Sequence, residues 1–138
     1  MARNHWIGIL LCAVALALGT AVAVEAPTDK GIGKITSIKL APLDPTLAAK
    51  GKTTFEQKCS ACHKSDERYV GPALKGVTQR RTPEWIMNMV LDPQGMTTEN
   101  TAAQQLLGEY MVQMTFQNVS EDDARAILEF LRENDTVK

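Results

Sequence analysis

The chain has 138 residues, the size of a single domain, and its formal net charge at pH 7 is −1. A charge this close to zero excludes the basic composition that favours non-specific nucleic-acid binding, so no nucleic-acid partner is expected. Aromatic residues make up only 5% of the chain. A domain this small would therefore gain stability from a large apolar cofactor at its centre.

Residues 1–26 have the pattern of an export signal. Arg3 precedes an apolar run from Trp6 to Val24, and residues 21–23 form an Ala-x-Ala cleavage signal. The run is also about long enough to span a bilayer, which takes ~20 apolar residues, so an uncleaved membrane anchor is the alternative. Either interpretation carries residues 27–138 across the membrane and predicts a periplasmic location.

Residues 27–45 are predicted to form an irregular arm or linker, because proline and glycine recur along them. Residues 46–138 follow as one domain with helical patterns. Helices are expected within residues 46–59, 82–92, 101–112 and 120–134. No segment has the alternating period of a strand, so the sequence predicts an all-α fold of several short helices joined by long loops.

Two of these helices have clear start signals. Thr82 is a suitable N-cap before Pro83 at the first helical position. Ser120 and Asp123 form an approximate capping box, and apolar residues at helical spacing follow them. Residues 70–77 are rich in glycine and proline and are predicted to form a loop.

The strongest functional signal is the order Cys-x-x-Cys-His at Cys59, Cys62 and His63. This is the signature of c-type haem attachment. Two thiols with two residues between them can reach the two vinyl groups on one edge of a porphyrin and form thioether bonds. The histidine beside the second cysteine is then placed to ligate the iron as the proximal ligand.

Other interpretations of the two cysteines fit less well. A thiol–disulfide redox pair would accompany a βαβ pattern, which is not visible. A zinc site needs about four ligands, and the sequence after residue 26 has no further cysteine or histidine. A disulfide across so short a loop would add little stability. The predicted cofactor is therefore one covalent haem c with its iron.

The second axial ligand cannot be histidine, because the only other histidine, His5, lies in the leader. A methionine is the usual partner in cytochromes c, and a lysine or no protein ligand are the alternatives. Five methionines follow the motif: Met87, Met89, Met96, Met111 and Met114. Met87 and Met89 lie in a predicted helix, where methionine more often fills the core. Met96 remains a candidate for the second axial ligand because it follows Gly95 in a predicted loop.

Residues 46–134 resemble the small class I cytochromes c that carry a single haem. The resemblance rests on four segments: GKTTFEQKCSACH, VGPALKGV, MTFQNVS and EDDARAILEFL. In that family the axial methionine lies on a loop shortly before the last helix, which implies Met114 as the distal iron ligand and Met111 as the second choice. Family members often have proline directly after this ligand, and here Thr115 takes its place.

The resemblance also implies the cytochrome c fold, in which short helices surround the haem and the first and last helices cross. Gly51, Phe55 and Phe130 are then expected at the crossing. Pro72 is implied as the residue whose backbone carbonyl holds the far ring nitrogen of His63, which orients the ring. A plain turn residue is the alternative for Pro72.

Arg80, Arg81 and Trp85 are further candidates for haem contact. Guanidinium groups favour carboxylates, and haem carries two propionates. A solvated basic pair and a core tryptophan are the alternative interpretation.

A haem with both axial positions filled by protein has no open place for a substrate. The predicted function is therefore one-electron transfer between respiratory redox partners, and the chain is not expected to be an enzyme. Two alternatives are a haem enzyme or gas sensor with an open sixth position, and a haem subunit of a membrane-bound oxidoreductase held by an uncleaved leader.

The charges are unevenly distributed along the chain. Residues 46–81 hold eight basic and three acidic residues, a net of +5, and residues 82–138 hold three basic and ten acidic residues, a net of −7. Positive charge around the haem motif predicts redox partners with acidic docking patches, and ordinary solubility charge is the alternative. The partners considered are a quinol-oxidising complex, a terminal oxidase and a nitrogen-oxide reductase.

Overall fold

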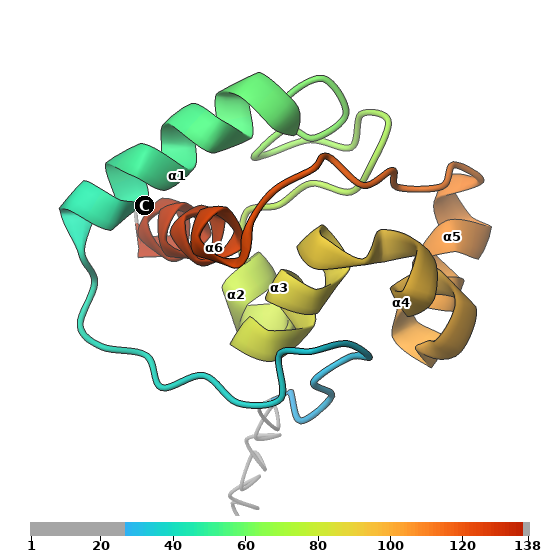
Figure 1. Cartoon of the computed structure of the whole chain (residues 1–138). Coiled ribbons are helices and arrows are strands. Elements are labelled where there is room, and N and C mark those ends of the chain that lie inside the picture. The colour runs from blue at the N-terminus through green and yellow to red at the C-terminus, as the bar shows by residue number, and fades with distance from the viewer. Residues whose placement is uncertain (1–26, 137–138) are drawn as a thin grey trace, which may run out of the picture.

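The computed structural model describes residues 27–136, and within that range it contains six helices and no strand (Figure 1). The predicted all-α fold is therefore confirmed. The helices are α1 (Pro45–Lys58), α2 (Val77–Arg80), α3 (Pro83–Leu91), α4 (Pro93–Glu99), α5 (Thr101–Tyr110) and α6 (Glu121–Thr136). The predicted signal peptide or anchor, residues 1–26, lies outside the described residues. None of the helices described here is both long and apolar enough to cross a bilayer.

Helices α1 and α6 cross at close range, as the resemblance implied (Figure 1). Gly51 of α1 lies directly against the backbone of α6, and a Cβ atom on Gly51 would stand only 1.9 Å from the carbonyl oxygen of Ala126. Beside this point the rings of Phe55 and Phe130 pack with their centroids 5.3 Å apart. Glycine at the crossing is thus required by the close approach of the two backbones.

The core lies between α6 and α3. The helical stripe of α6 is almost completely buried and comprises Ala124, Ile127, Leu128 and Leu131. Helix α3 contributes Trp85, Ile86 and Met87, each 4% exposed. Burial of these apolar side chains supplies the main driving force for packing the helices together.

The predicted helix starts are present. The Thr82 hydroxyl accepts a hydrogen bond from the backbone N–H of Trp85 at 3.1 Å, with Pro83 at the first helical position. At the start of α6 the Ser120 hydroxyl accepts from the N–H of Asp123 at 3.1 Å, and the Asp123 carboxylate accepts from the N–H of Ser120 at 3.2 Å. Both ends of the capping box are therefore formed.

The prediction of long loops was wrong in two places. Val77, expected at the end of the loop of residues 70–77, begins α2, and Met96, also expected in a loop, lies in α4. Single residues join three helices in succession: Asp92 ends α3 and caps α4, and Asn100 ends α4 and caps α5. A polar residue that both stops one helix and starts the next leaves no room for a loop.

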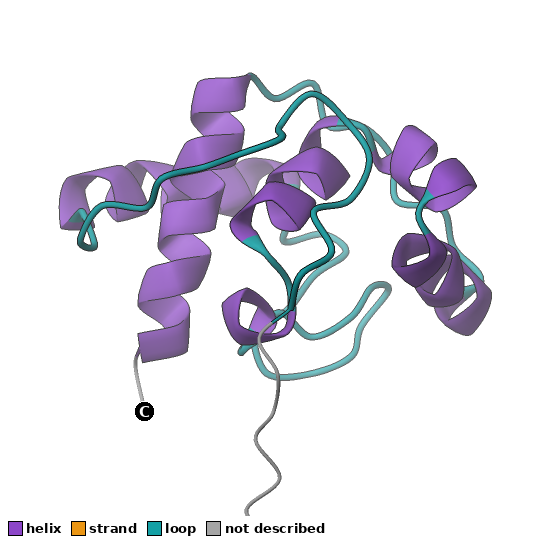
Figure 2. Cartoon of the chain, turned by 90° about the horizontal axis from the view of Figure 1, so that it is seen from below, coloured by secondary structure: helices purple, strands orange, loops and turns teal. Residues whose placement is uncertain are grey.

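Residues 27–44 of the predicted arm have no helix and run as a loop across the helices (Figure 2), and hydrogen bonds tie them to α3. The Asn88 amide donates to the carbonyls of Lys30 and Ile35 and accepts from the N–H of Ile35. The Glu84 carboxylate accepts from the N–H of Ile38 at 3.0 Å. These two buried polar side chains of α3 supply hydrogen-bond partners for backbone groups of the arm, which pairs with no strand in the described residues.

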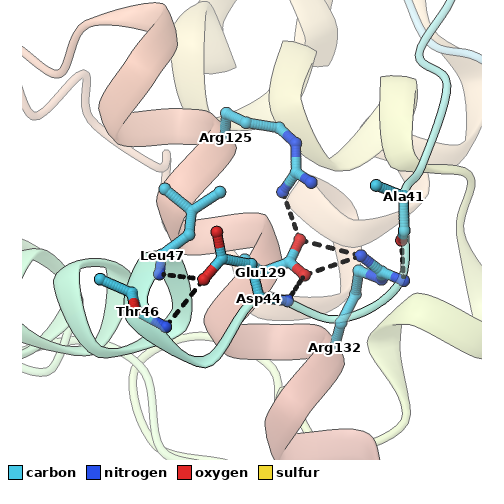
Figure 3. A network of polar contacts seen from close by, with 7 residues as sticks. All are labelled: Ala41, Asp44, Thr46, Leu47, Arg125, Glu129 and Arg132. Atoms are coloured by element: carbon cyan, nitrogen blue, oxygen red, sulfur yellow. Dashed lines mark hydrogen bonds and ion pairs between the residues drawn. The ribbon is translucent and has the colours of Figure 1, made fainter.

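A buried carboxylate joins the end of the arm to α6 (Figure 3). Glu129 is fully buried and is paired with Arg125 and Arg132 of its own helix. It also accepts the backbone N–H of Asp44 at 2.8 Å, and Arg132 donates to the carbonyl of Ala41 at 3.1 Å. The network therefore ties the chain just before α1 to α6.

Candidate functional site

A largely apolar cavity opens between the helices, and most of the residues predicted to bind haem line it. Cys59, Cys62 and His63 contribute from the end of α1 and the turn after it, and Pro72 contributes from the next loop. The remaining lining comes from all six helices, from the loop of residues 70–74 and from residues 111–120, which we call the methionine segment. Three basic side chains, Lys58, Arg80 and Arg81, also line the cavity, and none of its lining residues within 27–136 is acidic.

The two cysteines are held by a tight turn that follows α1. The carbonyl of Cys59 accepts hydrogen bonds from the N–H groups of Cys62 and His63 at 3.1 and 3.0 Å. Both thiols are free in the structure, with Cys59 partly buried and Cys62 exposed. Burial raises the pKa of the Cys59 thiol, and Lys58 works against that rise. The turn therefore presents two unbonded thiols and an imidazole to one wall of the cavity.

The His63 ring is fixed by its neighbours in the loop. Its Nδ1 lies 3.2 Å from the carbonyl oxygen of Pro72. A carbonyl can only accept, so Nδ1 carries the proton and Nε2 keeps its lone pair. Burial lowers the pKa of His63, and the bond to Pro72 only partly opposes this. The ring is accordingly neutral, with Nε2 able to ligate a metal.

Gly71 makes room for this ring. A Cβ atom on Gly71 would stand 2.6 Å from Cε1 of His63 and 3.0 Å from its Nδ1. The Gly71 N–H in turn donates to the carbonyl of Cys62 at 2.9 Å, which ties the loop back to the motif. The sequence-based interpretation named Pro72 but missed Gly71, because a glycine before a proline indicates only a turn and does not show which ring it will meet.

The structure separates the two methionines left open by the sequence. Met114 lines the cavity from the methionine segment. Met111 is 82% exposed, has a left-handed backbone with φ of 56°, and is absent from the cavity lining. Only Met114 of this pair is therefore positioned to act inside the cavity.

The remaining methionines fall into two groups. Met96 is completely buried in α4 and is not among the residues that line the cavity. Its sulfur lies 3.0 Å from the backbone nitrogen of Ile32. The prediction that Met96 lies in a loop, where it could ligate the iron, was therefore wrong. Met87 is buried in the core. Met89 lines the cavity from α3, where it fills space on the wall.

The basic residues and the tryptophan lie close together. The Arg81 guanidinium stacks on the Trp85 ring, 4.7 Å from its centroid. The indole N–H of Trp85 donates to the Asn100 side chain at 3.1 Å. Arg80 donates to the carbonyls of Lys75 and Ala73 at 2.7 and 3.2 Å. Trp85 thus has its N–H bonded within the protein, and the residue also lines the cavity, so both its interpretations stay predictions.

A sequence model of the family described as cytochrome c matches residues 48–135. The chain belongs to the cytochrome c family. Among solved structures, a cytochrome c from Rhodothermus marinus has a TM-score of 0.73 and 44% identity, covering 75% of this chain and 90% of that one. An engineered form of the same Rhodothermus marinus protein, 43% identical with a TM-score of 0.70, was solved with a bound carbene intermediate.

Shorter stretches match two further cytochromes. A cytochrome c2 of Rhodopseudomonas palustris is 53% identical over 34 residues, which is 25% of this chain and 29% of that protein. A cytochrome c-553-like protein of a Synechocystis strain is 38% identical over 48 residues, 34% of this chain and 46% of that protein. The matched stretches thus span less than half the length of these curated relatives.

Cytochromes c bind haem c covalently with its iron, and the residues of this chain fit that group. Two free thiols and a neutral imidazole share one wall of an apolar cavity, and a thioether lines another part of it. Gly71 leaves the space in which the His63 ring sits. The residues that would hold the haem are Cys59 and Cys62 by thioether bonds, His63 through Nε2 and Met114 through its sulfur.

Proposed function

We propose that this cytochrome c is a one-electron carrier whose iron is ligated by His63 and Met114. The observation that carries the proposal is that both side chains line the same apolar cavity beside the two free thiols. A haem iron bound there supplies a one-electron change between the ferric and ferrous states. His63 and Met114 would both hold the iron, and the bound group would then have no free site for a substrate.

The side chains around the cavity contribute the remaining properties of a carrier. The carbonyl of Pro72 keeps the proton on Nδ1 of His63, so Nε2 stays an electron-pair donor. The apolar lining limits access of water, which disfavours extra charge at the centre and helps to raise the potential. A thioether ligand favours the ferrous state and acts in the same direction.

We further propose that the protein works in the periplasm with redox partners that present acidic patches. The exported location rests on the pattern of residues 1–26, and the partner charge rests on the three basic and no acidic side chains along the cavity lining within residues 27–136. A quinol-oxidising complex as donor, with a terminal oxidase or a nitrogen-oxide reductase as acceptor, fits this chemistry.

The ligand assignment is tested by replacing Met114→Ala in the haem-loaded protein. We expect loss of the low-spin ferric spectrum with its sulfur-to-iron charge-transfer band, and a reduction potential lower by on the order of 100 mV, because the axial ligand strongly sets haem potentials. Met111→Ala should change neither quantity, since Met111 points to solvent. Normal low-spin ligation in Met114→Ala would eliminate Met114 as the ligand.

A second candidate function is small-molecule binding at an open sixth position. It is favoured by Thr115 in the place where family members often have proline, and by the carbene intermediate held in the engineered Rhodothermus marinus protein. Carbon monoxide separates the two candidates. Ready binding to the ferrous wild-type protein, together with a high-spin ferric spectrum, would support the second function and contradict the first.

A further inference from the structure

The side chain of Gln113 joins the backbone of Met114 to helix α4. Its Nε2 lies 2.9 Å from the carbonyl oxygen of Met114 and 3.5 Å from that of Pro93. Its Oε1 lies 3.0 Å from the hydroxyl of Thr97. One exposed amide therefore spans the methionine segment and the first two turns of α4.

The chemistry of these contacts fixes the orientation of the amide. Two backbone carbonyls face one end of the Gln113 amide, and carbonyls only accept, so that end must be the NH2 group. The other end is then the oxygen, which accepts from the Thr97 hydroxyl. Reversing the amide would set its oxygen against the carbonyl oxygen of Met114 and leave that carbonyl without its donor.

The anchor on α4 is rigid. Thr97 is 8% exposed, and its hydroxyl oxygen also lies 2.9 Å from the Pro93 carbonyl and 3.1 Å from the Gln94 carbonyl, so its single proton is shared between these carbonyls and the Gln113 oxygen. The neighbouring Met96 is completely buried in the core. A contact with Thr97 therefore ties the methionine segment to a part of the molecule whose position is set by packing.

The methionine segment has few other restraints. Within residues 27–136, its positions 112–119 make no backbone–backbone hydrogen bond, and the backbone turns into the left-handed region at Met111 and at Asn118. Lys58 reaches it from α1 and donates to the carbonyl of Gln117 at 3.1 Å. Thr115 lacks the ring that fixes φ when proline follows the ligand.

We propose that Gln113 is a positioning residue for the axial methionine. By donating to the carbonyl of Met114 and accepting from Thr97, it holds the Met114 backbone against α4 and opposes release of the thioether from the iron. This inference rests on the proposed ligation by Met114. If Gln113 has this role, removing its hydrogen bonds will make it easier for an external ligand to replace Met114 on the ferric iron.

The test uses imidazole binding to the ferric, haem-loaded protein, because imidazole competes with Met114. We expect Gln113→Leu and Thr97→Val each to tighten imidazole binding by about fivefold, the size expected for one neutral hydrogen bond. Thr97→Ser keeps the hydroxyl and should restore the wild-type affinity. The double variant should equal either single variant, because both remove the same bridge.

Gln104→Leu is the matched control. Gln104 also donates from Nε2 to a backbone carbonyl, that of Thr98, but it lies on α5 away from the methionine segment. Imidazole affinities of Gln113→Leu and Gln104→Leu that are equal, both at the wild-type level, would overturn the role of Gln113 even if Met114→Ala shows Met114 to be the ligand. Unchanged imidazole affinity and spectrum in Met114→Ala would instead remove the proposed ligation on which the role depends.

Discussion

At the candidate site the His63 ring lies directly against the backbone of Gly71. No left-handed backbone angle forces glycine at this position, so the requirement comes from space alone. The ring must also keep Nδ1 within reach of the Pro72 carbonyl. An added methyl group therefore acts on the orientation of the proximal ligand itself.

Gly71→Ala is expected to destabilise the folded protein by about 1–3 kcal/mol, the usual range for overpacking. It should also shift the ferric spectrum, since the ring must turn to escape the new Cβ. Denaturant unfolding and the visible spectrum measure the two effects. Gly108→Ala is the control, because nothing lies within 4 Å of its Cβ position in α5, and it should gain up to about 1 kcal/mol.

For single residues, the sequence predicted those site positions that belong to a motif with a fixed local spacing or to a segment that resembles the family. The Cys-x-x-Cys-His motif and the resemblance led to Cys59, Cys62, His63, Pro72 and Met114, and all five line one cavity. The ring contact of Gly71 and the amide bridge of Gln113 could not be predicted. Both depend on which residue a side chain meets across space, and glycine and glutamine carry no local signature for such contacts.

Among the elements, the buried Glu129 joins α6 to Asp44, the residue before α1 (Figure 3). Burial acts to raise the pKa of Glu129, but the N–H of Asp44 and the guanidinium groups of Arg125 and Arg132 outweigh burial, so its pKa lies below the usual glutamate value. The carboxylate therefore stabilises the fold at pH values above the ordinary pKa. That contribution is lost as the pH falls through the lowered pKa of the folded state.

Glu129→Gln is expected to cost about 1.5–3 kcal/mol of unfolding free energy at pH 7, the range for hydrogen bonds to charged groups. The variant should also lose less stability than the wild type between pH 5 and lower pH, since it has no carboxylate to protonate there. Urea titrations at several pH values measure both. Glu56→Gln, at an exposed position on α1, should follow the wild-type curve, and equal behaviour of the two variants would contradict the argument.

The helix starts show which helices can be predicted from neighbouring residues alone. Thr82 and Ser120 cap their own helices, so α3 and α6 were predictable from a few adjacent residues. Helix α2 was missed because its cap comes from far along the chain. The Asp135 carboxylate on α6 accepts from the N–H groups of Gly76 and Thr78, and no local pattern at residues 70–80 records that contact.

For the molecule as a whole, the arm packs on α3, and three basic residues line the cavity. The arm covers α3 through Asn88 and Glu84, polar residues whose role as backbone partners was not evident from a mostly apolar helix. The basic residues Lys58, Arg80 and Arg81 instead line the haem cavity. Part of the excess positive charge counted around the motif therefore lies at the cavity.

This location predicts how the reduced protein reacts with small inorganic oxidants. The rate constant with anionic hexacyanoferrate should fall several-fold as salt rises from about 10 mM to about 1 M, because the screening length shrinks from roughly 30 Å to roughly 3 Å. A cationic cobalt complex should show the opposite trend. Lys58→Gln should slow the anionic reaction at low salt, and Lys34→Gln, which removes the same charge from the arm outside the cavity lining, should slow it less. Equal slowing by both variants would mean that total charge, and not its placement at the cavity, guides the encounter.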